Sequence, residues 1–362
     1  MNFPAPRPSS ASIWTKCAAY PMLAARMPER PETDEAREGT CAAWLAEQSI
    51  RRGCAPTDMI GEAHSNGWVV TPDMAHHIAG YVRLLRSYGG ELDVERKVAL
   101  NDLIEGTPDA FGVVANSELR VDDLKYGMLP VEVYENPQVV IYAAALLRFM
   151  SARGVIIRKI RLGIYQPRTW HPLGVHRTWT LWPEELMRRA RLIEEAGWKT
   201  QDTNALATPG AHCRYCEAAS ICSAVTNAVY DATHHMHNAE ARQMTAAEMA
   251  TELDFLETAE AMFKARRETV RFEAEERIRR GEAVPGWMIE QGRGQRRWKA
   301  DEATVALLTG VDPVEGKMVT PAELERRGAD PEIVAKLTET PFTKARLMKM
   351  PAGYIAAKFG EL

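Results

Sequence analysis

The chain has 362 residues, 46% of them hydrophobic, which suits a large core and excludes a single small module. Its formal net charge of -4 argues against a protein that binds nucleic acid through overall positive charge, although a local basic groove is compatible with it. No apolar run approaches the roughly 20 residues of a membrane span, and the first ten residues do not resemble a signal peptide, so we expect a cytosolic protein without membrane contact.

The first part of the chain alternates between helical and strand-like patterns. Thr71 and Pro72 are suited to the N-cap and first position of a helix, and Asn116 with Ser117 is suited to a turn between two strands. We expect helices over 11–27, 38–53, 71–90, 136–150 and 182–198, and strands over 92–100, 111–115, 119–127 and 155–167. These elements predict an α/β fold in which an antiparallel hairpin joins a larger sheet.

The composition changes after Cys222 to long, charged sequence rich in Ala, Glu and Arg, which predicts a helix over 245–281. A strand-like WMIEQ and the basic GRGQRRWK follow. We therefore expect two domains, 1–230 and a mostly helical extension, 231–362, that carries a basic hairpin.

The stretch VDDLKYG places charges inside a predicted strand. Successive strand side chains alternate between faces, so Asp123 and Lys125 share one face while Asp122 and Leu124 lie on the other. A charge pair on the covered face of a sheet is costly unless a metal ion, a partner charge or water compensates for it.

Asp109 lies about as far before the predicted turn as Asp123 lies after it. Hairpin pairing could thus bring both carboxylates to a single divalent cation such as Mg²⁺, which prefers oxygen ligands and keeps several waters. Lys125 would stand beside the metal-bound water, where it could orient or help to deprotonate the nucleophile. Gln138 and Tyr142, at i and i+4 of the next helix, could face the same place; taken singly, they also suit a surface and a core position.

The order GTPD, DLK and QVVIY resembles the PD-(D/E)XK nuclease superfamily, in particular its RecB-like branch. The resemblance implies a restriction-endonuclease-like core, a mixed central sheet flanked by helices, and a Mg²⁺- or Mn²⁺-dependent phosphodiesterase. It implies Asp109, Asp123 and the backbone carbonyl of Leu124 as metal ligands and Lys125 as the catalytic lysine. Gln138 and Tyr142 match the motif of the helix that contacts DNA and supports the site.

One position departs from that family. RecB-like nucleases usually carry a further metal-binding histidine on an early helix, and here EGTCAAWLAE has Ala43 at that position. Glu47, one helical turn onward, or Glu38 could supply an oxygen ligand instead. We expect His64, His76 and His77 to be exposed residues rather than substitutes.

Three of the six cysteines, Cys213, Cys216 and Cys222, form a C-x2-C-x5-C pattern. Such a cluster binds zinc or an iron-sulfur centre and needs a fourth ligand, for which we choose Cys17 ahead of Cys41 and Cys54. A single upstream cysteine with three downstream resembles the iron-sulfur nucleases of the RecB-like branch. The resemblance implies a structural [4Fe-4S] cluster, and structural Zn²⁺ is the alternative.

Over most of its length the chain is similar to phage and prophage proteins with a RecB-like nuclease core. The resemblance implies an exonuclease acting on DNA ends in phage recombination or replication in the host cytosol, with a phage single-strand annealing protein as a candidate partner. A non-catalytic DNA-binding scaffold and a zinc-stapled endonuclease or nickase are the alternatives. The basic segment could contact a nucleic-acid backbone and stack a base, or could be a solvated hairpin; its residues are Arg293, Arg296, Arg297, Trp298 and Lys299.

Overall fold

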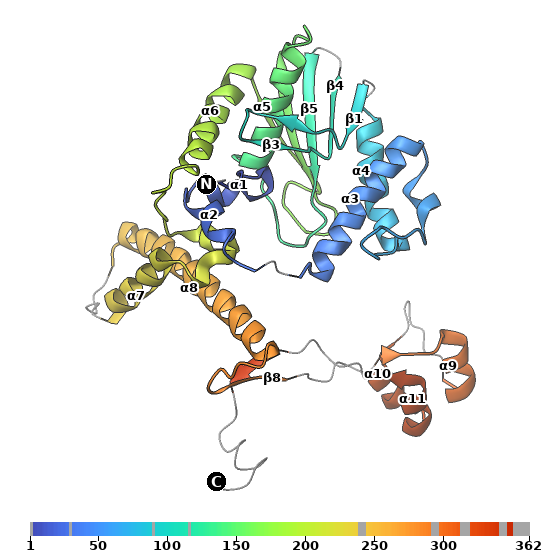
Figure 1. The fold of residues 1–362 in the computed structure, drawn as a ribbon. Helices are drawn as coiled ribbons and strands as arrows, with labels where there is room; N and C mark the ends of the chain where they lie inside the picture. Colours follow the sequence, from blue (N-terminus) through green and yellow to red (C-terminus); the bar gives the residue numbers. More distant parts are fainter. Residues whose placement is uncertain are drawn as a thin grey trace. The chain divides into compact units, whose positions relative to one another are not determined.

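The computed structural model describes residues 3–28, 31–88, 91–114, 117–237, 244–290, 297–311, 319–339 and 346–349 (Figure 1). Contacts within the chain divide it into two units, residues 1–267 and 268–362. The boundary predicted at 230 falls inside helix α7 (Ser223–His237), and the division by contacts lies within the longer helix α8 (Ala246–Arg279). The division into domains 1–230 and 231–362 stays a prediction.

A five-stranded sheet forms the centre of the first unit, in the order β1-β4-β5-β6-β7. Its strands are β1 (Glu91–Val94), β4 (Ala110–Val114), β5 (Glu118–Leu124), β6 (Lys159–Tyr165) and β7 (His176–Leu181). Strands β5 and β6 are parallel and are joined through helix α5 (Pro137–Ser151), whereas every other neighbouring pair is antiparallel. The structure confirms the α/β class with a mixed central sheet flanked by helices.

Each face of the sheet has its own apolar core. Helices α3 (Asp34–Arg52) and α4 (Pro72–Arg86) cover one face, where Leu124 and Tyr165 are buried. The other face carries Leu119 and Val121 and is covered by four helices, α1 (Ala11–Trp14), α2 (Tyr20–Ala24), α5 and α6 (Pro183–Lys199). Successive side chains of a strand point to opposite faces, so the adjacent acids Asp122 and Asp123 of β5 lie toward different cores.

Side-chain caps fix the starts of the helices around the site. Thr33, Thr71 and Asn136 accept hydrogen bonds from backbone N–H groups in the first turns of α3, α4 and α5. The helix predicted over 11–27 is instead two short helices, α1 and α2. No helix in the described ranges combines the length and the apolar character that a bilayer crossing requires.

The strand predicted over 92–100 is broken. Strand β1 ends at Val94, and Glu95 adopts a left-handed backbone conformation with φ 51°. The chain continues as β2 (Val98–Ala99), which pairs with β3 (Glu105–Gly106) outside the main sheet. The break turns the chain away from the sheet beside the end of β5.

In the second unit, β8 (Trp287–Glu290) pairs with β11 (Arg346–Lys349), and β9 (Arg297–Trp298) pairs with β10 (Thr338–Glu339). Strands β8 and β9 do not pair with each other, so the predicted basic hairpin is wrong as a pairing scheme. Short helices α9 (Glu302–Thr309), α10 (Pro321–Arg326) and α11 (Pro331–Leu337) build a small core around Val305 and Leu324.

On the α4 side of the sheet, the carboxylate of Asp122 is held by two side chains. Its Oδ1 lies 2.7 Å from Nε2 of His176, and Oδ2 accepts a hydrogen bond from the hydroxyl of Tyr88. The neighbouring position on β6 is Gly163, where an added Cβ would lie 1.9 Å from Asp122 Oδ1 and 2.8 Å from His176 Nε2. Glycine at 163 therefore makes room for a buried carboxylate.

We predict that Gly163→Ala lowers the free energy of unfolding by about 1 to 3 kcal/mol, the usual range for overpacking a filled core. The new methyl group must displace either the carboxylate or the imidazole. Denaturant titration of the purified variant and the wild type measures the change.

Gly39→Ala is the matched control, since an added Cβ at this position of α3 meets no atom within 4 Å. It should raise stability by about 0.5 to 1 kcal/mol, because alanine is favoured over glycine inside a helix. A Gly163→Ala variant as stable as the wild type would contradict the packing described for Asp122.

Candidate active site

Two acids face each other where β4 begins and β5 ends. Ala110 pairs with Asp122, so one step along the antiparallel ladder Asp109 lies opposite Asp123. Asp109 is tied to β5 itself, because its Oδ2 accepts a hydrogen bond of 2.6 Å from the backbone N–H of Leu124. The hairpin thus brings together the pair of carboxylates that the sequence predicted.

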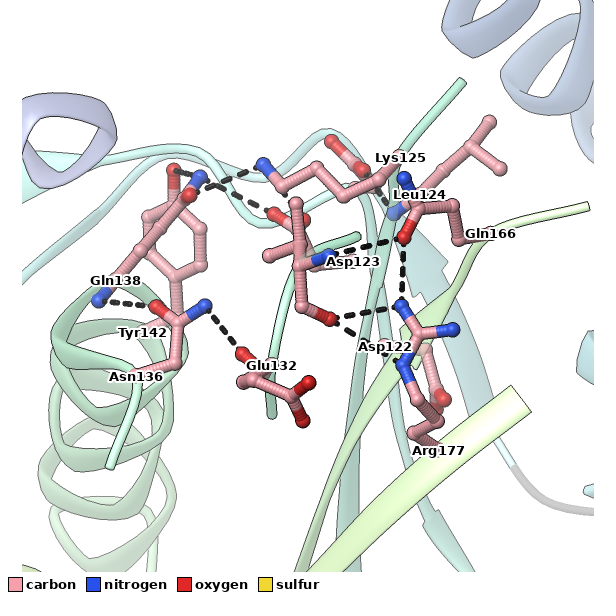
Figure 2. A network of polar contacts seen from close by, with 12 residues as sticks. Asp122, Asp123, Leu124, Lys125, Glu132, Asn136, Gln138, Tyr142, Gln166 and Arg177 are labelled. Atoms are coloured by element: carbon pink, nitrogen blue, oxygen red, sulfur yellow. Dashed lines mark hydrogen bonds and ion pairs between the residues drawn. The ribbon is translucent and has the colours of Figure 1, made fainter. Parts of the chain in front are cut away.

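Lys125 lies on the same side of the sheet, and its ammonium is held at two points (Figure 2). Nζ lies 2.8 Å from Asp123 Oδ2 and donates a hydrogen bond of 3.0 Å to Oε1 of Gln138. The amide of Gln138 in turn donates to Asp123 Oδ1 at 3.1 Å and to the hydroxyl of Tyr142 at 3.2 Å. Gln138 and Tyr142 therefore take part in the hydrogen-bond network around Asp123 and Lys125. Gln138 is not merely a surface residue, and Tyr142 is not merely a core residue.

Burial and neighbouring charges shift the pKa values of three residues in this network. Burial raises the pKa of the Asp109 carboxyl well above its usual range, and the charge of Asp123 adds to the effect while Lys125 opposes it. Burial lowers the pKa of Lys125, but the carboxylate of Asp123 outweighs it, and the pKa ends above that of an ordinary lysine. Burial also raises the pKa of Tyr142 to about 12. At neutral pH the network therefore holds an ammonium and a phenol, and the carboxyl of Asp109 resists ionisation.

One oxygen of Asp123 lacks a hydrogen bond. Asp123 is only 1% exposed, and among the described residues its buried Oδ2 accepts no hydrogen bond. The ammonium of Lys125 lies nearby as an ion-pair partner, without hydrogen-bond geometry. A buried carboxylate oxygen with unused lone pairs is a natural ligand for a cation.

Glu95, which sequence reasoning missed, is a third acid at this site. Burial raises its pKa to about 7, with Glu47 the next contributor, and Asp123 adds to the shift while Arg51 opposes it. Its backbone N–H donates to the carbonyl of Asp109 at 3.2 Å. The left-handed conformation at Glu95 is uncommon for a residue other than glycine, and such strain is often found at functional sites.

Of the two glutamates proposed to replace the missing histidine, Glu47 lies toward the site. It pairs with Arg51 at 2.7 Å, and Arg51 also donates to the carbonyl of Val94 at the end of β1. Glu38 instead pairs with Arg168. A role for Glu47 in binding metal stays a prediction.

The three histidines considered as substitute metal ligands make no contact among the described residues that bears on the site. His64 accepts a backbone hydrogen bond from Asn66, His76 is exposed, and His77 lies 3.3 Å from the hydroxyl of Tyr126. The position of the family's histidine, Ala43, lies one helical turn before Glu47 on α3. Nothing in these contacts makes any of the three a substitute ligand.

The loop between β5 and α5 is held by two buried polar side chains that the sequence did not suggest (Figure 2). Gln166 donates to the carbonyls of Gly127 and Leu129 at 2.7 and 2.8 Å. Arg177, 1% exposed, donates to the carbonyl of Val131 and to Gln166 Oε1, each at 2.7 Å. These bonds fix the path of the loop and so set Gln138 against Lys125.

The four predicted cluster cysteines come from distant parts of the chain. Cys213 lies in the short helix η4 (Ala211–Tyr215), which packs against α1, the helix that precedes Cys17. Burial raises the pKa of Cys213 and brings that of Cys216 to about 12, and the thiol of Cys17 raises both further. Cys41 and Cys54 belong to the other core. Cys17 therefore follows a helix that packs against the segment with Cys213, and a shared cluster of the four cysteines stays a prediction.

No group of three or more His, Cys, Asp or Glu side chains in the described ranges is drawn together closely enough to hold a metal ion. The arrangement at β4 and β5 offers two carboxylates and a backbone carbonyl. That set suits Mg²⁺, which is commonly held by one or two carboxylates with several waters.

The predicted nucleic-acid-binding segment belongs to the second unit. The indole of Trp298 packs against the small core and donates to the carbonyl of Val319 at 2.8 Å, and the backbone N–H of Lys299 donates to Leu337. Arg293, Arg296 and the side chain of Arg297 lie outside the described residues. Nucleic-acid contact by this segment stays a prediction.

We predict that Asp109→Asn stabilises the metal-free protein at pH 8 but not near pH 4. A raised pKa means that folding favours the protonated carboxyl, so the penalty is absent below the ordinary aspartate pKa of about 3.9 and grows as the pH rises. Asparagine mimics the protonated form, and its oxygen can still accept from Leu124. The gain at pH 8, measured by denaturant titration in EDTA, should exceed about 0.5 kcal/mol, the range of ordinary surface substitutions.

Asp102→Asn, at an exposed acid, is the control and should give the same small change at both pH values. An Asp109→Asn effect that is equally independent of pH would show that residue 109 is not a strained, buried acid.

Comparison with known proteins gives one extended match. A family described as "Protein of unknown function (DUF2800)" matches residues 7–349. A search of curated proteins gave no match.

Similarity to solved structures is weaker. A candidate exonuclease from Eubacterium rectale is 10% identical, with 68% of this chain and 93% of that chain covered and a TM-score of 0.34. An alkaline exonuclease from Laribacter hongkongensis is 8% identical, with 55% and 91% covered and a TM-score of 0.24. These scores are too low to assign a shared fold. The match to residues 7–349 spans most of the sequence, and the chain therefore belongs to the DUF2800 family.

Proposed function

We propose that this protein is a Mg²⁺- or Mn²⁺-dependent deoxyribonuclease of the PD-(D/E)XK type, with its active site at the end of β5. The observation that carries the proposal is the opposition of Asp109 and Asp123 on neighbouring strands, with the ammonium of Lys125 2.8 Å from Asp123. Hydrolysis of a phosphodiester needs a bound cation, a positioned water and positive charge near the phosphate. These three side chains are suited to supply each of them.

The residues fit a divalent cation on their own chemistry. The buried Oδ2 of Asp123 has no hydrogen bond among the described residues, and the pKa of Asp109 is raised by burial and then by Asp123. A cation bound between the two carboxylates, and also reached by the carbonyl of Leu124, would give Asp123 Oδ2 a partner. It would also offset the repulsion between Asp109 and Asp123. When bound, Mg²⁺ or Mn²⁺ lowers the pKa of a coordinated water and stabilises charge on a phosphate.

Lys125 is suited to act as a cation rather than as a base. Its pKa is raised overall, so the amine keeps its proton at neutral pH and can donate to a phosphate oxygen or to the attacking water. Gln138 holds this ammonium in place and also binds Asp123, and Tyr142 supports Gln138. Gln138 and Tyr142 thus position the reacting groups.

We further infer an exonuclease that acts on DNA ends in phage recombination or replication, with a phage single-strand annealing protein as candidate partner. This part rests on the resemblance of the ordered motifs GTPD, DLK and QVVIY to RecB-like nucleases. The alternatives are a non-catalytic DNA-binding scaffold, which Ala43 favours, and a zinc-stapled endonuclease or nickase.

We predict that the purified protein degrades end-labelled linear DNA with Mn²⁺ and that Lys125→Ala lowers the rate at least about 100-fold, as expected for loss of a positioned charge. Gel analysis of linear and closed circular DNA follows the reaction and distinguishes end-dependent from internal cleavage. Closed circles that stay intact support the exonuclease.

Lys199→Ala, at an exposed lysine that ends α6, is the matched control and should cleave like the wild type. Linear DNA that survives with the wild-type protein and Mn²⁺ would favour the scaffold alternative. Equal rates for Lys125→Ala and Lys199→Ala would instead remove Lys125 from the site.

We also propose that Cys17, Cys213, Cys216 and Cys222 bind a structural [4Fe-4S] cluster, with Zn²⁺ as the alternative. Cys17, Cys213 and Cys222 are each less than 10% exposed, and Cys213 Sγ accepts a hydrogen bond from the backbone N–H of Gly210 at 3.4 Å. Metal binds the thiolate form, so a bound metal would have to displace the protons that burial keeps on Cys213 and Cys216. The cluster would join the start of the first unit to its end, a long loop whose closure constrains the unfolded chain.

We predict a brown protein with about four iron and four sulfide ions per chain, measured by elemental analysis and visible absorption after anaerobic purification. Cys17→Ser should lose iron and colour, because a complete set of four thiolates is broken. The control is Cys54→Ser, which lies in the other core and should keep both. Zinc in place of iron would select the alternative, and full iron in Cys17→Ser would exclude Cys17 as a ligand.

A further inference from the structure

We propose that a cavity beside the active site binds a single DNA strand and leads it to Lys125, an inference that rests on the proposed nuclease function. The cavity has a volume of about 910 Å³ and is lined by both Lys125 and Gln138. Its other walls come from residues 7–20, from the loop before α5, from α6 and from residues 215–217. The N-terminal segment packs against α5, so these walls belong to the first unit.

The cavity lining holds four cationic side chains and three acidic ones, and so carries a small excess of positive charge. Arg7 and Lys16 are exposed, and neither forms an ion pair with a carboxylate in the part of the chain that the structure describes. Of the three acids, Glu135 pairs with Arg189, Glu132 lies 3.0 Å from His171, and Glu217 accepts a hydrogen bond from the hydroxyl of Tyr20. The available charge therefore suits an anion such as a phosphate backbone.

Two tyrosines in the lining present their rings to solvent. Tyr134 is 63% exposed and Tyr215 is 57% exposed. The ring of Tyr134 is supported from behind by Trp179, with ring centroids 5.0 Å apart, and Arg189 lies over Trp179 at 5.0 Å. An exposed aromatic ring on a fixed support, next to unpaired cations, is the arrangement on which bases of a single strand stack.

The size of the cavity selects one strand over two. Its volume is within the range of small-ligand sites and suits a few nucleotides of one strand better than both strands of a duplex. The stacked bases of a duplex also hide the faces that Tyr134 and Tyr215 would contact. Because Lys125 lies in the lining, a strand held there would present a phosphodiester to the active site.

The test is fluorescence anisotropy with labelled oligothymidylate in EDTA, where no cleavage occurs. Tyr134→Ala/Tyr215→Ala should raise Kd at least about tenfold, since each stacked base contributes to binding. Arg7→Ala/Lys16→Ala should also weaken binding, and it should reduce the slope of log Kd against log salt by about 1.4, the value for two phosphate contacts on a single strand.

The matched controls are Tyr230→Ala on α7, also exposed, and Arg83→Ala on α4, both outside the cavity lining. Both should bind as the wild type does. A blunt duplex of equal length should bind more weakly and should not respond to the tyrosine substitutions.

Two outcomes would overturn the inference: cavity variants that bind the oligonucleotide as tightly as the controls, or duplex binding that falls as much as single-strand binding. Cleavage is a separate readout. If wild-type protein binds through the cavity but never cleaves with Mn²⁺, the nuclease proposal fails while this inference stands. If the cavity variants bind the oligonucleotide weakly but cleave as fast as the wild type, the inference about the cavity fails while the nuclease proposal stands.

Discussion

The candidate site depends on two facing carboxylates at the end of one antiparallel pair of strands, the buried Asp123 and the half-buried Asp109. Their repulsion is only partly offset by Lys125, and the pKa of Asp109 is raised as a result of burial first and of Asp123 second. Such a pair is unfavourable for folding alone. The elements around it, the loop fixed by Arg177 and the helix that carries Gln138, hold the pair in place instead of relieving it.

The two adjacent acids of β5 are equally buried but differ in the hydrogen bonds of their carboxylates. Asp122 is 2% exposed and is fully engaged, by His176 and Tyr88 through its side chain and by Tyr81 through its carbonyl. Asp123 is as deeply buried, yet one of its oxygens has no hydrogen bond among the described residues. The first carboxylate completes a core, whereas the second is left with capacity for a ligand.

Local patterns in the sequence predicted much of the site because its central residues follow the strand period and a hairpin. Alternation assigned Asp123 and Lys125 to one face, and symmetry about a turn brought in Asp109. Glu95 was missed because its place depends on a left-handed break that no alternating pattern reveals. Gln166 and Arg177 were missed because their partners lie far along the chain, and β8 was expected beside β9 although each pairs with a strand some 40 or more residues away.

The central claim is that Asp109 and Asp123 share one divalent cation. Anomalous diffraction from crystals soaked in Mn²⁺ tests it most directly, since it locates manganese without relying on activity. We predict a single peak within about 2.2 Å of a carboxylate oxygen from each residue, near the ammonium of Lys125. A map without a peak there, or with manganese bound to only one of the two acids, would contradict the account.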